Sequence, residues 1–253
     1  MDVSGIMPAG RTKIASGAAK GLEELEREII TCGRCKRLVR YRQQVVERRP
    51  PRYRDWAYWG KPLPGFGDCQ ARLLILGLAP AAHGGNRTGR MFTGDRSGDW
   101  LMEALFRFGF ANQSQSQRAG DGLALKDAYI TATLRCCPPD NNPLPSEVAA
   151  CRPYLLEELR LLGSVRVLVA LGRIAFVSTL AAFLEDYRFT LSPRPAFGHG
   201  QVYPLPNGQT LIASFHPSQQ NTQTGRLSQE MFDHIFARAK KILGSGPGGA
   251  DGG

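Results

Sequence analysis

Four short, continuous apolar runs alternate with helical patterns along this chain, and this alternation constrains the fold more than any other feature. The runs cover residues 73–78, 128–132, 165–171 and 210–214. Runs of this length are typical of strands that are covered on both faces. We therefore predict a three-layer α/β/α sandwich with a central, mainly parallel, four-stranded sheet.

Amphipathic helical patterns lie before, between and after these runs. They cover residues 22–30, 98–108, 146–162, 172–184 and 228–243. Ser146 is the expected N-cap of the third helix, since Pro145 precedes it. In parallel α/β sheets, ligands bind outside the carboxyl ends of the strands. We therefore expect the chemistry of this protein in the loops after Leu78, Ala132 and Ser214.

The 253 residues are enough for one domain with a substantial core. We assign residues 21–243 to a single domain, residues 1–20 to a flexible arm and residues 244–253 to a disordered, glycine-rich tail. No apolar run reaches the roughly 20 residues of a membrane span, and residues 1–20 lack the apolar core of a secretory signal. We therefore expect a cytoplasmic protein without a membrane partner, and a monomer by default.

The charge is strongly positive. Lysine and arginine total 32 against 22 acidic residues, which gives +10, and 25 of the 32 are arginine. Guanidinium groups bind phosphates as a fork and stack on bases, so the surplus favours a nucleic-acid partner. A genome rich in GC codons would produce the same bias. The basic stretch from Arg34 to Arg54 is interpreted either as a DNA contact or as a solvated face.

Six cysteines in a reducing compartment are not expected to form disulfides. Soft thiolate donors select zinc or an iron–sulfur cluster, and the spacing does not choose between these. Cys137 is a competing ligand beside Cys136, while Cys69 is interpreted as a buried free thiol. The set that we favour for a metal or cluster is Cys32, Cys35, Cys136 and Cys151.

Residues 77–95 form the most unusual stretch of the chain, with five glycines that let a ligand approach the backbone closely. The stretch matches neither the dinucleotide-binding nor the Walker A pattern. It combines hydrogen-bond donors, an aromatic ring and a carboxylate: His83, Asn86, Arg87, Arg90, Phe92 and Asp95. At the same predicted sheet end, His216 follows the last strand, and a polar, almost uncharged segment follows it. We interpret both loops as functional.

The stretches GLAPAAHGGNRTGRMFTGD (77–95) and HPSQQNTQTGRL (216–227), together with the cysteine framework, resemble family 5, type B, of the uracil-DNA glycosylase superfamily. The resemblance spans residues 22–243. It implies the uracil-DNA-glycosylase-like fold and a structural [4Fe-4S] cluster held by Cys32, Cys35, Cys136 and Cys151. It also implies that Cys137 is not a ligand.

The activity implied by this resemblance is that of a monofunctional DNA glycosylase in base excision repair. Such an enzyme flips out a damaged base and hydrolyses its N-glycosidic bond, which leaves an abasic site. The expected substrates are uracil and other deaminated or damaged bases, such as hypoxanthine and oxidised pyrimidines, in single- or double-stranded DNA of the bacterial nucleoid. No lysine lies in either motif, so strand cleavage through a Schiff base is not expected.

The resemblance also implies roles for individual residues. His216 would donate to uracil O2, where negative charge develops, and Asp95 would position water or stabilise the sugar cation. The alternative for Asp95 is a helix N-cap. The expected base contacts are Ala79, Ala82, His83, Asn86 and Phe92. The expected DNA contacts are Arg90, Ser218, Gln220, Arg226 and Leu227.

The sequence departs from the wider superfamily in two respects. Many relatives carry a water-positioning carboxylate or Asn early in the first motif, where this chain has Ala79, Ala81 and Ala82. Relatives commonly place a base-reading Asn where this chain has Ala132, which predicts a broad substrate range. A rival interpretation is a non-catalytic, zinc-containing nucleic-acid-binding module. It explains the charge and the cysteines but leaves Phe92, Asp95 and His216 unexplained.

Overall fold

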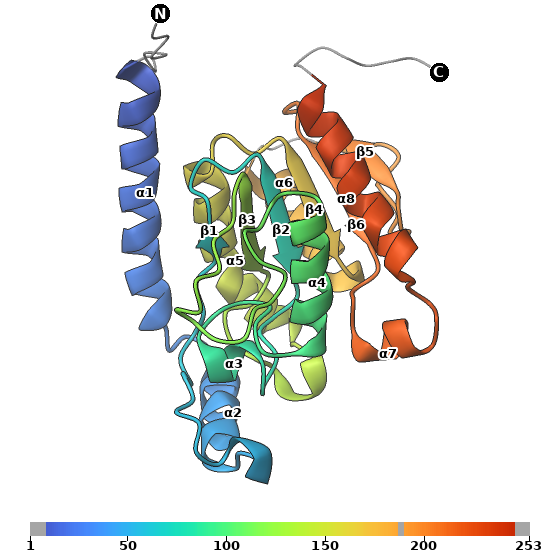
Figure 1. Cartoon of the computed structure of the whole chain (residues 1–253). Helices are drawn as coiled ribbons and strands as arrows, with labels where there is room; N and C mark the ends of the chain where they lie inside the picture. The colour runs from blue at the N-terminus through green and yellow to red at the C-terminus, as the bar shows by residue number, and fades with distance from the viewer. Residues whose placement is uncertain (1–8, 187–189, 246–253) are drawn as a thin grey trace, which may run out of the picture.

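The computed structural model describes residues 9–186 and 190–245, and it places a single mixed sheet at the centre of the molecule (Figure 1). Within these residues the sheet has six strands in the order β1-β3-β2-β4-β6-β5. The four parallel strands are β2 (Leu73–Gly77), β3 (Ala128–Ala132), β4 (Val167–Leu171) and β6 (Thr210–Ser214). The four predicted strands are therefore confirmed, and each begins and ends within two residues of its apolar run.

The prediction of only four strands was wrong, because a short antiparallel strand lies at each edge of the sheet. β1 (Phe66–Gly67) pairs with β3, and β5 (Val202–Pro204) pairs with β6. These strands have two and three residues and are partly exposed, so neither contains the continuous apolar run that marks the inner strands.

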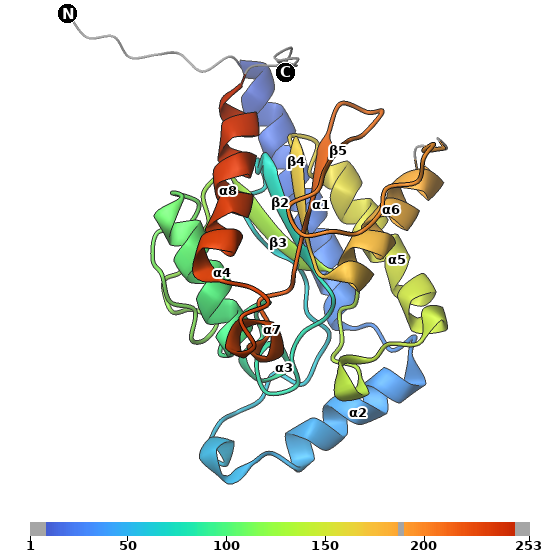
Figure 2. The ribbon, with the colours of Figure 1, turned by 90° about the vertical axis from the view of Figure 1, so that its right-hand side faces the viewer.

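Helices cover both faces of the sheet, which confirms the three-layer sandwich (Figure 2). One face packs against α4 (Arg96–Arg107) and α8 (Gln229–Gly244), and the other packs against α5 (Pro145–Leu161) and α6 (Arg173–Asp186). Successive side chains of a strand point to opposite faces. In β2, Ile75 accordingly lies in the core with α4 and α8, whereas Leu74 and Leu76 lie in the core with α5 and α6.

Helix α1 (Ala9–Ile30) runs alongside α5 and includes residues 9–20, where the sequence predicts a flexible arm. Gly10, Gly17 and Gly21 are poor helix formers, so the sequence gives little sign of a helix there, and the segment continues an amphipathic end that is anchored. Leu25 and Ile29 are buried there with Tyr154 of α5. Residues 1–8 and 246–253, which complete the predicted arm and tail, lie outside the described residues.

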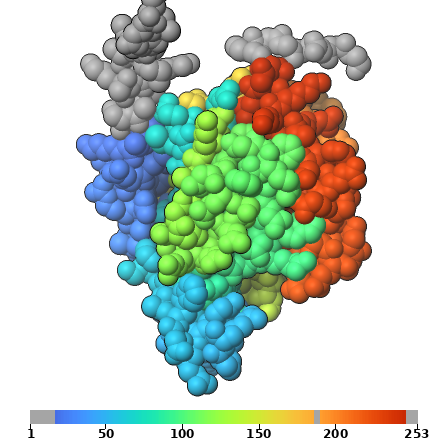
Figure 3. All heavy atoms as spheres, viewed as in Figure 1, coloured from blue at the N-terminus to red at the C-terminus, as the bar shows by residue number. Residues whose placement is uncertain are grey.

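Helix α2 (Lys36–Glu47) was not predicted, because its basic sequence has only a narrow apolar stripe. Figure 3 shows that the segment containing α2 forms the narrow lower end of the molecule. Two short helices, α3 (Gly85–Thr88) and α7 (Gln219–Gln223), lie near it, at the carboxyl ends of the parallel strands (Figure 1). No helix among the described residues has the length and apolar character needed to cross a membrane.

The N-terminus of α5 differs from the prediction, because the N-cap is Leu144 and not Ser146. Pro145 occupies the first helical position, where its missing N–H costs no hydrogen bond. The Glu147 carboxylate accepts a hydrogen bond from the Leu144 N–H at 2.8 Å. The proline and this reciprocal bond fix the start of the helix two residues earlier than a serine cap would.

Candidate active site

The glycine-rich loop after β2 folds around α3 and forms one wall of an open pocket of about 560 Å³. Ala82, His83 and Asp95 are the predicted site residues that line it. Ala81, Gly84, Gly94 and Arg96 come from the same loop and from the start of α4. The remaining lining residues come from four other segments: Tyr41, Arg52, Tyr53, Pro138, Asp140, Asn141 and Gln219. The pocket therefore lies at the carboxyl end of the sheet, where ligand sites of parallel α/β folds occur.

Asp95 both caps a helix and lines this pocket. Its Oδ1 accepts a hydrogen bond from the Gly98 N–H at 2.9 Å, so it is the N-cap of α4. Its Oδ2 lies against Gly84, where a Cβ atom would stand only 1.9 Å from that oxygen. Burial raises the pKa of Asp95, and the hydrogen bond from Gly98 partly opposes this rise. The capping and the pocket roles considered for this residue are therefore compatible.

Phe92 is held in a backbone conformation that side-chain-bearing residues rarely adopt, with φ of +48°. Its ring lies across Gly77 at the end of β2, where a Cβ atom would approach two ring carbons to 2.8 Å. Its carbonyl lies against Gly98, where a Cβ atom would approach it to 2.3 Å. Phe92 therefore fits in this position because residues 77 and 98 are glycines. Backbone strain of this kind is typical of functional sites.

His216 follows β6, and its ring lies 6.0 Å from that of Phe92, between centroids, at an interplanar angle of 31°. Burial lowers the pKa of His216 to about 4, so the imidazole is neutral at physiological pH. The His216 carbonyl accepts a hydrogen bond from Asn221 Nδ2 at 2.8 Å, which ties the residue to α7. A neutral imidazole keeps one ring N–H, which it can donate in a hydrogen bond.

A cluster of aromatic residues before β1 holds the glycine-rich loop from outside. The Arg87 guanidinium lies between the rings of Tyr53 and Trp56, 4.2 Å from each centroid. Arg87 also donates to the carbonyls of His83 and Gly94, at 2.7 and 2.8 Å. The contact of Arg87 with the two aromatic rings was not predicted, because it joins residues that are more than 30 positions apart in the sequence.

His83 is fixed by the same aromatic segment. Its Nδ1 lies 3.0 Å from the Tyr58 hydroxyl. Burial lowers the pKa of His83, and the charges of Arg52 and Arg87 lower it further. The pocket therefore presents a neutral His83 beside the buried carboxyl of Asp95.

Two predicted DNA contacts are corrected. The Arg90 guanidinium is held by Asp121 and by the Ser116 hydroxyl, at 2.8 and 2.9 Å, and its side chain is 10% exposed. Leu227 is 1% exposed and packs in the core with α4 and α8, so it cannot fill a vacated base stack. Both residues belong to the two stretches that resemble the family, but contacts within the fold account for the placement of their side chains.

Phe92 and the predicted catalytic His216 do not line this pocket. Two further predicted base contacts also lie away from its surface. Asn86 is buried, and its Nδ2 donates to the Ala82 carbonyl at 3.4 Å. Ala79 packs against the apolar cluster that contains the cysteines. Each of them therefore supports the loop backbone instead of facing the open pocket.

The predicted DNA contacts of the second motif occupy a more open surface. The Ser218 hydroxyl caps α7 by accepting from the Asn221 N–H at 3.3 Å, and Gln220 is exposed in the first turn. The exposed Arg226 places its guanidinium 4.8 Å from the Phe215 ring centroid. Contacts of these three residues with DNA stay predictions.

Asp140 and Asn141 are pocket residues that sequence reasoning missed. They are consecutive, both have φ of +53°, and both line the pocket with Asp95. Asn and Asp tolerate this left-handed conformation better than other residues with side chains. The run of prolines, Asp and Asn after Cys137 was the available signal, because it predicts a tight turn at a strand's carboxyl end.

The four favoured cysteines line one small apolar pocket between α1, α2, α5 and the loop after β3. Cys137 is buried outside this pocket. Burial raises the pKa of Cys136 to about 12 and that of Cys151 to about 11. Among the described residues, no group of three or more His, Cys, Asp or Glu side chains is arranged so that it could hold a metal ion.

Arg42 gives this cysteine pocket a buried positive charge. Arg42 is 8% exposed, and its Nη1 lies 3.4 Å from Cys136 Sγ, which is a hydrogen-bonding distance for sulfur. Its Nε has no hydrogen-bond partner in the part of the chain that the structure describes. A buried cation beside soft donors, without a carboxylate partner, is costly unless an anion neutralises it. The charge of Arg42 would therefore suit an anionic group in this pocket, although the described cysteine side chains do not stand in a metal-binding arrangement.

The comparisons with known proteins agree with this geometry. The family model described as "Uracil DNA glycosylase superfamily" matches residues 64–240. "Type-5 uracil-DNA glycosylase" of Mycobacterium tuberculosis (strain CDC 1551 / Oshkosh) is 49% identical over 230 residues, covering 90% of this chain and 84% of that protein. The protein of the same description from Thermus thermophilus is 48% identical over 222 residues, 88% of this chain and 98% of that protein.

The same similarity extends to an archaeal relative. "Type-5 uracil-DNA glycosylase" of Pyrobaculum aerophilum is 42% identical over 222 residues, covering 88% of this chain and 93% of that protein. The chain belongs to the type-5 family of the uracil-DNA glycosylase superfamily. The predicted family and fold are therefore confirmed.

Proposed function

We propose that this protein excises uracil from DNA by hydrolysing the N-glycosidic bond, which leaves an abasic site for base excision repair. The observation that carries the proposal is that Phe92, on the glycine-rich loop, lies beside His216, which follows β6, while the buried Asp95 comes three residues after Phe92 on the same loop. The type-5 relatives are named for this activity. The rival interpretation, a non-catalytic nucleic-acid-binding module, does not explain this arrangement.

In the proposed mechanism, the flipped uracil stacks on Phe92, whose ring the backbone holds in place. As the glycosidic bond breaks, electrons move to the base and negative charge develops on uracil O2. The neutral His216 donates its N–H to that oxygen and stabilises the departing anion. The ionised Asp95 carboxylate stabilises the sugar cation and orients the attacking water. The water oxygen forms the new bond to C1′ as Asp95 takes up a water proton, and that proton then passes to the uracil anion, so that neutral uracil and an abasic site are released.

We extend the proposal to a broad set of damaged bases, including hypoxanthine and oxidised pyrimidines. Ala132 lies at the end of β3, where relatives commonly carry a base-reading Asn, and its methyl group cannot hydrogen-bond to a base edge. A site without such a donor rejects non-uracil bases less strongly. Base release from matched duplexes that carry each lesion checks this extension.

We also propose that Cys32, Cys35, Cys136 and Cys151 hold a structural [4Fe-4S] cluster. Bound there, the cluster would join the end of α1 to the loop after β3 and to α5. The soft donor set and the buried charge of Arg42 support an anionic group. Iron and sulfide analysis of the purified protein tests the proposal, and a zinc-loaded protein without iron would overturn it.

The remaining parts of the proposal concern the setting. We propose a monomer that acts on single- or double-stranded DNA in the bacterial cytoplasm, associated with the nucleoid and not with a membrane. The positive net charge supports attraction to DNA phosphates. Sedimentation of the protein with and without DNA checks the oligomeric state.

The decisive experiment measures base release from a labelled duplex with one U opposite G, in EDTA, with and without later alkali. Strand breaks should require alkali and should be lost in Asp95→Asn and His216→Ala. Asp99→Asn, which removes an exposed carboxylate one turn further along α4, is the matched control and should retain activity. No base release from U or hypoxanthine, despite tight binding, would promote the binding module.

A further inference from the structure

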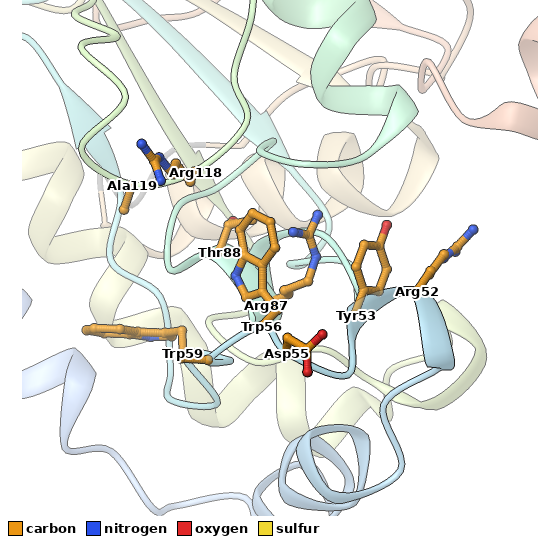
Figure 4. A pocket seen from close by; sticks show the side chains of 10 residues that line it. Arg52, Tyr53, Asp55, Trp56, Trp59, Arg87, Thr88, Arg118 and Ala119 are labelled. Atoms are coloured by element: carbon orange, nitrogen blue, oxygen red, sulfur yellow. The ribbon is translucent and has the colours of Figure 1, made fainter.

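A second pocket of about 520 Å³ opens beside the candidate active site, and the mechanism above does not use it (Figure 4). Its walls combine indole and phenol rings with arginines. Trp56 and Trp59 come from the segment before β1, and Arg118 comes from the loop before β3. The other lining residues are Arg52, Tyr53, Asp55, Ala57, Arg87, Thr88 and Ala119.

The two pockets share a wall. Arg52 and Tyr53 line both this aromatic pocket and the pocket that contains Asp95. A DNA strand whose flipped nucleotide enters the Asp95 pocket would therefore pass Arg52 and Tyr53. The next unpaired nucleotide of that strand would lie at the mouth of the aromatic pocket.

The aromatic pocket is held in shape by hydrogen bonds to its backbone. Arg49 Nη1 donates to the Trp56 carbonyl at 2.8 Å, and the Trp59 N–H donates to the Arg87 carbonyl at 3.0 Å. Trp59 Nε1 donates to the Pro62 carbonyl at 3.2 Å. Aromatic faces that are fixed before binding lose little conformational entropy when a ligand stacks on them.

The charges around the aromatic pocket suit a phosphate-bearing ligand. Arg52 and Arg118 are exposed, and neither forms a salt bridge within residues 9–186 and 190–245. Asp55 is the single acidic residue among those that line the pocket. Stacking rings combined with unpaired arginines are the usual means of binding single-stranded nucleic acid without reading its sequence.

We propose that this aromatic pocket binds one unpaired nucleotide of the DNA strand, next to the nucleotide that enters the Asp95 pocket. The base would stack on the indole of Trp56, and its phosphate would lie near Arg52 and Arg118. The proposal rests on the proposed function, because that function brings the sugar of the flipped nucleotide to Asp95, which lines the neighbouring pocket. It predicts tighter binding to single-stranded or frayed DNA than to an intact duplex.

The test measures binding of a short, labelled, single-stranded oligonucleotide that carries one 2′-fluoro-2′-deoxyuridine, whose glycosidic bond resists hydrolysis. Each flanking nucleotide is replaced in turn by an abasic residue. In the full-length protein, loss of one neighbouring base should weaken binding roughly tenfold, the scale of one base–aromatic stack. Trp56→Leu should bind the intact oligonucleotide about tenfold more weakly and should be insensitive to that position.

Two further variants keep the test independent of folding defects at Trp56. Arg118→Gln changes an exposed side chain and should weaken binding and reduce its salt dependence. Arg194→Gln removes another exposed arginine, which lines neither pocket and lies outside the basic stretch, and it should bind like the parent protein. Equal losses at all flanking positions in the parent protein, or equal binding by Arg118→Gln and Arg194→Gln, would overturn the proposal.

Failure of this proposal is distinct from failure of the proposed function. Release of uracil from the same oligonucleotide with ordinary deoxyuridine reports the glycosylase activity. If the protein releases uracil but abasic replacement weakens binding equally at every flanking position, the proposed nucleotide-binding role of the aromatic pocket is rejected and the glycosylase activity is not. A single sensitive position, removed by Trp56→Leu, supports the subsite whatever the rate of base release.

Discussion

At the residue scale, Asp95 meets two requirements that oppose each other. Burial raises the pKa of its carboxyl group, so the folded protein holds this proton more tightly than the unfolded chain does. Ionising Asp95 at neutral pH therefore costs folding stability, which falls as pH rises above the pKa of the unfolded state. The proposed mechanism nevertheless needs the ionised carboxylate.

We therefore expect Asp95→Asn to separate stability from activity. Asn is as good an N-cap as Asp and has no charge to bury, so the variant should melt at or above the temperature of the parent protein at neutral pH. The rate of base release should fall roughly 10²- to 10⁴-fold, the scale of an acid–base group. Calorimetry and single-turnover kinetics measure both effects, and a marked loss of melting temperature would contradict the capping argument.

The pH dependence of the parent enzyme should reflect the same carboxyl group. Base release should decline on the acidic side as Asp95 takes up its proton, and this decline should begin at higher pH than for an exposed aspartate. His216 should add no titration between pH 5 and pH 8, since burial lowers its pKa to about 4. Nitrogen NMR of labelled histidine checks this expectation, and a His216 midpoint near that of free histidine would refute it.

At the element scale, the loop after β2 works because glycine at position 84 leaves room for the Asp95 carboxylate. In Gly84→Ala the new Cβ atom would overlap Oδ2, at 1.9 Å, so the carboxylate must move. We expect at least a tenfold loss of base release with the fold retained, because small displacements of catalytic groups are costly. Gly163→Ala, which meets no atom within 4 Å, is the control, and equal activities of the two variants would contradict this account.

Helix α2 should matter to the cysteine pocket through Arg42. Arg42→Met keeps the buried volume but removes the charge that faces Cys136, so the protein should retain less iron and lose its visible chromophore faster in air. Arg40→Met changes an exposed arginine of the same helix and should retain iron like the parent protein. Equal iron content in both variants would show that Arg42 does not stabilise the proposed cluster.

Elements with strong apolar patterns were the ones that sequence could predict. The four inner strands and the helices that cover them followed from periodicity, because a buried face demands it. Helix α2 and the edge strands β1 and β5 did not, since basic or very short segments carry no such pattern. Arg90 is held by Asp121, and Leu227 is buried against α4 and α8. A sequence motif does not reveal these contacts, because the partners lie elsewhere in the chain.

At the scale of the whole molecule, a buried ion pair joins the sheet to α5 and the cysteine loop. Arg135 Nη2 lies 2.5 Å from Glu158 Oε2, and its Nη1 donates to the Thr131 hydroxyl at 2.6 Å. Arg135→Met leaves Glu158 buried without its partner and should lower the free energy of unfolding by roughly 3–5 kcal/mol. Adding Glu158→Gln should recover part of this loss in urea titrations, and a larger loss in the double variant would contradict the pairing.

The boundary of the family match and the boundary of the functional unit do not coincide. The match begins at residue 64, and every strand of the described sheet lies after that point. Three residues before that point nevertheless line the pockets: Arg52, Tyr53 and Trp56. The rings of Tyr53 and Trp56 also hold Arg87 of the glycine-rich loop. A fragment trimmed to the matched core would keep the whole sheet and lose the outer support of its active site. Minimal repair enzymes built from this scaffold should therefore start upstream of α2.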